Sequence, residues 1–407
     1  MHEYVPGTVT DLQTLPYQSP DGEIQSGKRV FHRLFWTFEP CVMAFPYCKP
    51  MVQVDGTWLY GKYTQILLIA VAQDDNRNLL PIAFAIVERE CFESWEFFLT
   101  NLRRHIVKED NICLISDRSK GLLAAIRRSG VPWSEIKYAT YELEPRRFRQ
   151  RFARLESQMS SLPTNLRTWL GSMENWQWTQ SYDEGFRYGQ MTTNLVEAVN
   201  SVLRRTRHLP ISAVFSATFY RLATLMSKMG SKQAKQIEAE HVYVEVVRKA
   251  MAVYSRRAQT MNAKLYSRDL ETFRVQEYIG RRSGLPPRSY AVDLRNRRCE
   301  CGIFQTLRYP CAHVHAACAR ANLNVEQFIN EIYTLQRALR IWGNEFPVMP
   351  DISNWEVPPL AFEMVLDRSL RRHPRGRPQS TRIRNDMDVR ETGEPKLCTV
   401  CRTSGHN

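Results

Sequence analysis

Hydrophobic positions in the first third of the chain follow strand and helix periods and predict a sheet with helices. The run from Met51 to Trp58 alternates its side chains as a strand does, and two later runs are apolar enough to be buried strands. Apolar residues then recur between Ser94 and Ile106 at the spacing of an amphipathic helix. In chain order, the predicted elements are strands at 51–58, 65–72 and 79–87, a helix at 94–106, a strand at 112–117 and a helix at 119–128.

Two aspartates mark strands of this predicted sheet. Asp55 is expected where the first strand ends, and Asp117 ends the fourth. The element order suggests an RNase H-like mixed sheet of the α/β class, in which two carboxylates converge at one edge. Joined by a third acid, they can hold two magnesium ions about 4 Å apart, which activate the attacking oxygen and stabilise the leaving oxygen of a phosphodiester. Each aspartate alone is more simply a turn former or a helix N-cap, so the prediction depends on the pair.

Three motifs stand out at Asp55–Lys62, Ile115–Leu122 and Arg187–Asn200. Together they resemble the Mutator-like element (MULE) transposases of plant genomes. The first two segments are similar to the first and second aspartate motifs of that family, and the third is similar to the helix entry that carries its third acid. The resemblance extends from about His2 through most of the chain. It implies a DDE-type transposase whose catalytic and magnesium- or manganese-binding acids are Asp55, Asp117 and Glu197.

The third acid depends on this resemblance, because a Glu in the first turn of a helix is usually only a favourable partner of the helix dipole. The chain also departs from the family pattern. Only residues 1–49 precede the first strand, where family members carry a DNA-binding domain. After the second acid, a further strand and helix are missing, and 130–133 runs almost directly into a predicted helical stretch at 136–140. That loss predicts an unpaired sheet edge beside Asp117 and impaired catalysis.

The segments Cys299-Glu300-Cys301 and Cys311-Ala312-His313 have the composition of a zinc site. Their three thiolates and one imidazole form a complete tetrahedral ligand set. The alternative is three reduced core cysteines and a solvent-exposed histidine, but a predicted strand at 290–294 and a helix at 314–321 frame the motif and favour zinc. The C-x-C and C-x-H spacing resembles the SWIM zinc finger, and His315 and Cys318 are neighbouring candidates left out of the set. The predicted ligands are Cys299, Cys301, Cys311 and His313.

Two weaker motifs occupy the end of the chain. Cys398, Cys401 and His406 resemble the start of a CCHC zinc knuckle, but three ligands without a fourth make a poor site, so zinc binding there is not favoured. Arg375 and Arg377 lie in a Pro-Arg-Gly-Arg-Pro segment that resembles an AT-hook, which enters the minor groove of A·T-rich DNA. A basic, proline-rich disordered linker explains the same residues equally well.

Composition fits a nucleic-acid partner. The 407 residues carry a net charge of +14, and 43% are hydrophobic, enough for a real core. Five of ten cysteines belong to the two zinc-like motifs and the others show no disulfide framework, which favours a reducing compartment. No apolar run reaches about 18 residues, so no membrane span is expected. The family and the basic stretch 368–384 predict a nucleus-resident protein that binds transposon-end DNA, with a homo-oligomer left open.

Three functions stay open from the sequence. The first is a MULE-type transposase, impaired in cleavage; the second is a non-catalytic nuclear zinc- and DNA-binding regulator derived from one; the third is a coding relic. Further helices are predicted at 143–158, 163–173, 194–205 and 211–229. The predicted organisation is a lead-in at 1–49, an RNase H-like core at 50–133, a helical insertion with the third acid at 134–230, a connector at 231–285, a SWIM finger at 286–325, an extension with a basic tail at 326–397 and the truncated knuckle at 398–407.

Overall fold

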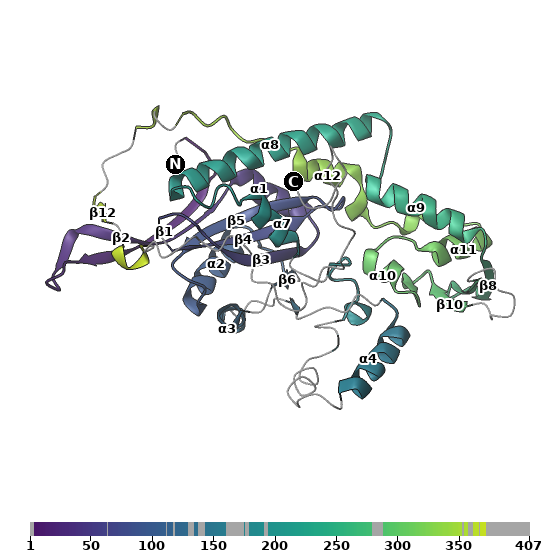
Figure 1. Ribbon diagram of the computed structural model, residues 1–407. Helices are drawn as coiled ribbons and strands as arrows, with labels where there is room; N and C mark the ends of the chain where they lie inside the picture. Colours follow the sequence, from purple (N-terminus) through teal and green to yellow (C-terminus); the bar gives the residue numbers. More distant parts are fainter. Residues whose placement is uncertain are drawn as a thin grey trace, which may run out of the picture. The chain divides into compact units, whose positions relative to one another are not determined.

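The fold is mixed α/β, with a large mixed sheet and a smaller antiparallel sheet (Figure 1). A computed structural model of the chain provides the coordinates. It describes residues 4–62, 64–110, 112–116, 119–128, 134–136, 143–159, 175, 179–190, 194–278, 288–351, 354–356, 361–365 and 367–371.

The large sheet contains the strands that the hydrophobic pattern predicts. Its order is β1-β2-β5-β4-β3-β6-β7. Neighbours β5, β4 and β3 are antiparallel, whereas β6 runs parallel to β3 and β7 parallel to β6. Every residue of β4 is buried, as expected for a central strand covered on both faces. The bounds are β3 Met51–Trp58, β4 Ile66–Gln73, β5 Leu79–Val87, β6 Cys113–Ile115 and β7 Ser134–Ile136.

The edge of β6 is paired, so the predicted open edge is wrong. Cys113 of β6 lies opposite Ser134 of β7, and Ile115 lies opposite Ile136. Ile136, the first residue of the helical stretch expected at 136–140, is instead the last residue of strand β7. A three-residue strand is too short to show a period of its own, which is why the hydrophobic pattern misses it.

Two N-terminal strands extend the sheet beyond the predicted core. β1 (Val9–Gln18) and β2 (Ile24–Thr37) form an antiparallel hairpin, and the end of β2 pairs with β5. The short strand β12 (Glu363–Val365) runs parallel to β2. Arg33 of β2 donates to both carboxylate oxygens of Glu88, at 2.9 and 2.5 Å. This bidentate ion pair fixes the hairpin to the chain that leaves β5.

Helices lie on both sides of the large sheet, with α8 on one side and α2 and α3 on the other (Figure 1). Trp36 of β2 donates through Nε1 to Thr218 of α8 at 3.2 Å and stacks on Phe84 of β5 at 5.3 Å between ring centroids. The helices here are α1 Glu39–Ala44, α2 Phe92–His105, α3 Lys120–Arg128, α4 Pro145–Met159, α7 Asn194–Val202, α8 Ile211–Glu238, α9 Glu245–Ala258 and α12 Leu335–Trp342, with 3-10 turns η1 Phe45–Tyr47, η2 Gln180–Tyr182, η3 Val325–Phe328, η4 Glu331–Tyr333 and η6 Arg368–Leu370.

The smaller sheet and its helices form what we call the finger module. Its strands follow the antiparallel order β11-β10-β9-β8, and Val275, Val292 and Val314 share its buried core. None of the described helices is long and apolar enough to cross a membrane. The module comprises β8 Asn262–Ser267, β9 Thr272–Glu277, β10 Arg288–Asp293, β11 Arg298–Cys299, α10 Ile303–Leu307 and α11 Ala312–Ala321.

Candidate metal centre and acidic site

Four buried ligand groups converge in the finger module. The thiols and the imidazole offer one ligand atom each, and these atoms all lie within 4.8 Å of one another. Tetrahedral zinc with Zn–S bonds of about 2.3 Å fits among donors at this spacing. The structure brings together the four predicted ligands, Cys299, Cys301, Cys311 and His313.

Local backbone geometry presents these ligands. Cys299 ends β11, and Gly302 with φ +79° turns the chain back so that its amide donates to Cys299 O at 2.9 Å. Gln305 holds the same residue from both sides, because its Nε2 donates to Cys299 O at 2.9 Å and its Oε1 accepts from Cys299 N at 3.0 Å. Cys311 is the N-cap of α11, which places His313 in the first turn.

A second layer of groups orients the imidazole of His313. Its Nδ1 faces the thiols, 3.5 Å from the Sγ of Cys299, and its Nε2 lies 3.5 Å from a carboxylate oxygen of Glu277. Arg257 donates to the other oxygen of Glu277 at 2.5 Å. The ring of Tyr290 stacks on the imidazole at 4.1 Å between centroids. A carboxylate behind the ligating histidine is the usual outer partner in zinc sites, and the sequence prediction did not include it.

The three clustered thiols shift one another's pKa values. Hydrogen bonds with the Cys301 and Cys311 thiols, together with burial, raise the pKa of Cys299 well above its ordinary value. Burial also acts to raise the pKa of Cys311, but hydrogen bonds from the other two thiols outweigh it and hold that pKa well below normal. Zinc would release the thiol protons, because only thiolates ligate it.

The two neighbouring candidates stand apart from this set. Burial lowers the pKa of His315 to about 4, so its imidazole is neutral at physiological pH. Burial raises the pKa of Cys318 to about 12, and its side chain packs in the core of the finger module. The possible metal-binding cluster found among the described residues contains neither of them.

The first and third acids lie on elements that pack together. Asp55 is half-buried in β3, and its carboxylate accepts from Asn200 Nδ2 at 2.9 Å and from the Gly56 amide at 2.9 Å. Asn200 belongs to α7, which packs on β3. Glu197 precedes Asn200 by three positions and therefore shares its helix face. The bond from Asn200 thus directs the helix face of Glu197 toward the strand that carries Asp55.

The second acid lies outside the described residues, but its strand is described. In the parallel pair of β3 and β6, Gln53 lies opposite Ile115. Asp55 and Asp117 each follow one of these partners by two positions in the sequence. The tail candidates Arg375, Arg377, Cys398, Cys401 and His406 also lie outside the described residues.

One further carboxylate was missed by sequence reasoning. Glu90 follows β5 and lies against Gly56, so closely that a Cβ at position 56 would overlap its carboxylate oxygen. The glycine next to Asp55 therefore makes room for another acid. A charged residue just after a strand resembles ordinary solvated surface, so the sequence carried no signal for it.

Buried charges also lie before β3 begins and after β4 ends. Asp74 accepts from the indole nitrogen of Trp342 at 2.8 Å, and Lys49 donates to Gln73 at 2.9 Å. Neither carboxylate oxygen of Asp75 has a hydrogen-bond partner among the described residues. Burial raises the pKa of Asp75 to about 8 and lowers the pKa of Lys49 to about 8. Asp75 therefore reduces stability at high pH, where its buried carboxyl group must ionise, and Lys49 reduces it at lower pH, where its buried amine must take up a proton.

A Cys₃His centre beside a mixed α/β sheet defines a zinc-finger protein with a separate acid-bearing core. Comparison with known families identifies both parts: the MULE transposase domain model matches residues 51–143, and the SWIM zinc finger model matches residues 287–322. The chain therefore contains a MULE transposase domain and a SWIM zinc finger, consistent with a MULE transposase-derived protein. No curated protein and no solved structure matches the chain. A transposase domain implies DNA binding in general.

Proposed function

We propose that this protein binds DNA and zinc and retains the acid site of a DDE-type transposase. The observation that carries the proposal is the hydrogen bond from Asn200 to Asp55 at 2.9 Å, because it joins the third-acid helix to the first-acid strand. The match of residues 51–143 to the MULE transposase domain supports it.

We further propose that the large sheet is RNase H-like. Three antiparallel strands, β5, β4 and β3, are followed by β6 and β7, which run parallel to β3. In this arrangement the end of β6 at Ile115 lies beside Gln53 of β3, two positions before Asp55 in the sequence. Asp117 follows Ile115 by the same two positions in the sequence, so the proposal takes the two aspartates as the first two acids of the site.

The donors at this site suit a hard divalent cation. Carboxylate oxygens are the preferred ligands of magnesium and manganese, and Asp55, Asp117 and Glu197 would hold them. When bound, such cations supply charge stabilisation and an activated water for phosphodiester cleavage. Asn200 and the Gly56 amide orient the Asp55 carboxylate. The impairment predicted from sequence depended on an open edge of β6, and the pairing with β7 removes that reason.

Metal binding tests the proposal directly. We expect magnesium or manganese to bind the purified, zinc-loaded chain by calorimetry and to support nicking of DNA. The nearly isosteric Asp55→Asn should abolish both while leaving zinc content and folding intact. Asp293→Asn, which changes an acid in the finger module, serves as the matched control. Cleavage that survives Asp55→Asn would remove that residue from the site.

A second function remains if no divalent cation binds. The SWIM finger and the basic composition would then support a non-catalytic, nuclear regulator derived from a transposase, with zinc but no magnesium. The observation that favours this alternative is the completeness of the Cys₃His cluster, which needs no acid site to fold. Nuclear residence belongs to both functions, and imaging of a fluorescent fusion in cells tests it.

A further inference from the structure

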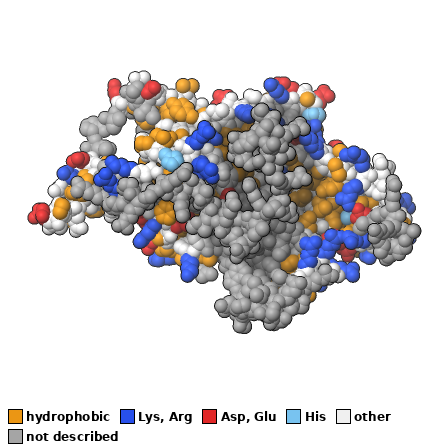
Figure 2. Space-filling model, viewed as in Figure 1, with side chains coloured by type: hydrophobic (Ala, Val, Ile, Leu, Met, Phe, Trp, Pro, Cys, Tyr) orange, Lys and Arg blue, Asp and Glu red, His pale blue; other side chains and the backbone are white. Residues whose placement is uncertain are grey.

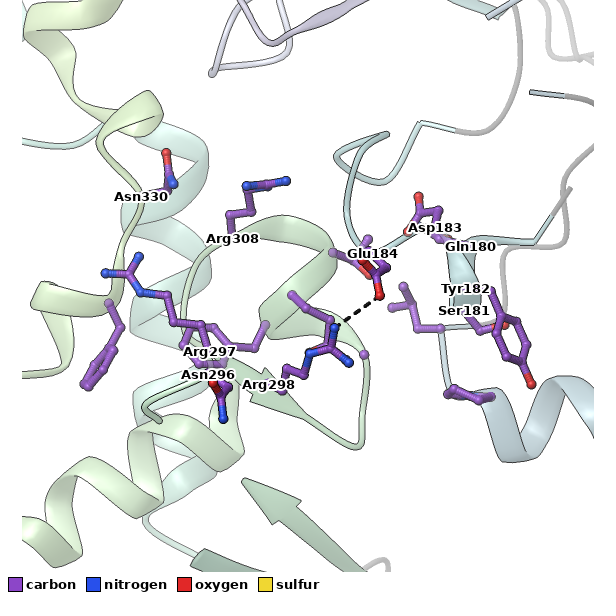
Figure 3. A pocket seen from close by; sticks show the side chains of 17 residues that line it. Gln180, Ser181, Tyr182, Asp183, Glu184, Asn296, Arg297, Arg298, Arg308 and Asn330 are labelled. Carbon is purple, nitrogen blue, oxygen red and sulfur yellow. Dashed lines mark hydrogen bonds and ion pairs between the residues drawn. The ribbon is translucent and has the colours of Figure 1, made fainter. Parts of the chain in front are cut away.

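A pocket of about 470 Å³ lies between the finger module and the segment that precedes the third-acid helix (Figure 3). We call it the finger pocket. One wall is the turn at 296–298 with α10 and Arg308, and the other is the segment 180–184. The second wall continues toward α7, which carries Glu197. A ligand in the finger pocket would therefore contact both the zinc finger and the chain that leads to the acid site.

The pocket contains more positive charge than its own acids neutralise. Three arginines line it, and Arg298 forms an ion pair with Glu184 at 3.2 Å across the pocket (Figure 3). The carboxylate of Asp183 interacts with residues of its own segment: it accepts a hydrogen bond from the Gly185 amide at 2.9 Å and lies 3.8 Å from Arg187. The other two arginines, Arg297 and Arg308, have no carboxylate within 4 Å among the described residues.

Arg308 is held in place before any ligand arrives. Its guanidinium lies over the ring of Tyr188 at 5.0 Å, and its backbone oxygen accepts from the Asn330 amide at 3.0 Å. The Nε of Arg308 is buried and has no hydrogen-bond partner among the described residues. An arginine that is already ordered loses less side-chain entropy on binding, and its planar fork matches the oxygens of a phosphate.

The surroundings of the pocket are basic as well. Figure 2 shows lysine and arginine side chains gathered over the finger-module side of the view. Exposed members of the module that flank the pocket include Arg295 in the same turn. A concave site with fixed arginines in a basic surface suits a polyanion better than a neutral ligand.

We propose that the finger pocket binds backbone phosphates of a DNA strand through Arg297 and Arg308. The inference rests on the proposed function in taking DNA as the partner, and it adds the site of contact. Phosphate contacts position a nucleic acid without reading its sequence. The strand held there bridges the zinc finger and the segment that enters α7.

Binding of a fluorescein-labelled oligonucleotide, followed by anisotropy between 50 and 200 mM salt, tests this site. The double variant Arg297→Gln/Arg308→Gln should weaken binding about 10-fold or more and reduce the log–log salt slope by nearly 2, because each phosphate contact contributes about 0.9. The control Arg104→Gln/Arg256→Gln removes the same charge from exposed arginines elsewhere and should change affinity less than about 3-fold. Zinc content and circular dichroism confirm that each variant is folded.

Several outcomes would overturn the proposed binding site. Equal losses of DNA affinity in the double variant and in the control would mean that only net charge matters. An unchanged salt slope in the double variant would exclude the finger pocket as a site of phosphate contact. If the double variant fails to fold, Arg297→Gln alone, at an exposed turn position, should still lower the slope by about 1. Wild-type protein that binds no DNA would refute the DNA function as well. Calorimetric binding of inorganic pyrophosphate without any oligonucleotide binding would instead assign the pocket to a free phosphate compound.

Discussion

Gly185 offers a sharp test of how the third-acid segment is attached to the zinc finger. Its φ is +80°, and a Cβ built on it would overlap the backbone oxygen of Gln305. Gln305 in turn holds the backbone of Cys299 through two hydrogen bonds. Gly185→Ala should therefore strain the segment and push on a residue that supports a zinc ligand.

The expected cost has two parts. A left-handed backbone costs a non-glycine residue about 1–2 kcal/mol. Overpacking against a backbone oxygen that cannot rotate away adds about 1–3 kcal/mol. Gly22, in the hairpin turn between β1 and β2, isolates the first part, because its φ is +85° and nothing lies within 4 Å of its Cβ position. Gly22→Ala should therefore cost only the backbone part.

Thermal melting of the two variants and release of zinc to a colorimetric chelator provide the comparison. We expect the Gly185→Ala midpoint to lie several degrees below that of Gly22→Ala, at about 2–4 °C per kcal/mol for a domain-sized unit. Zinc should also leave Gly185→Ala faster. The reasoning is refuted if both alanine variants melt together and keep zinc equally well.

Three further predictions concern the zinc ligands, the carboxylate behind His313 and the buried Asp75. Cys311→Ser should lose zinc and melt the finger module, since the free energy of metal binding there is free energy of folding; metal analysis of the purified variant checks this. Glu277→Gln removes the carboxylate 3.5 Å from His313 and should weaken zinc binding about 10- to 100-fold in a chelator competition. Burial raises the pKa of Asp75 to about 8 from an unfolded value near 3.9, so its contribution to stability is complete below pH 4 and is lost as the pH rises through 8. Asp75→Asn should thus raise the melting midpoint more at pH 8 than at pH 5; an equal effect at both values would contradict the assignment.

The zinc ligands and the central strands could be predicted from the sequence because their signals are local. Cys299 to His313 is a short segment from the end of β11 through α10 to the start of α11, and the spacing itself defines a tetrahedral set. β5 occupies the predicted residues 79–87 because an apolar run of that length has few alternatives in a buried sheet. Neither inference requires knowledge of what packs against the element.

The missed features depend on residues far apart in the chain. Asn200 meets Asp55 across 145 positions, and Glu277 at the end of β9 reaches His313 in helix α11. The hairpin of β1 and β2 carries many exposed positions, so its apolar pattern is weak. Only the folded chain shows which polar side chains are partners, because contacts between elements far apart in the sequence leave no period in it.

The hydrogen bond from Trp342 to Asp74 has a consequence for the order in which the protein is made. Trp342 lies in the core that surrounds the large sheet, although 268 residues separate it from Asp74. The ribosome must therefore complete the whole zinc finger before the sheet receives this core side chain. At 5–20 residues per second this delay is roughly 15 to 50 seconds, during which the nascent sheet keeps part of its apolar surface uncovered and open to chaperones.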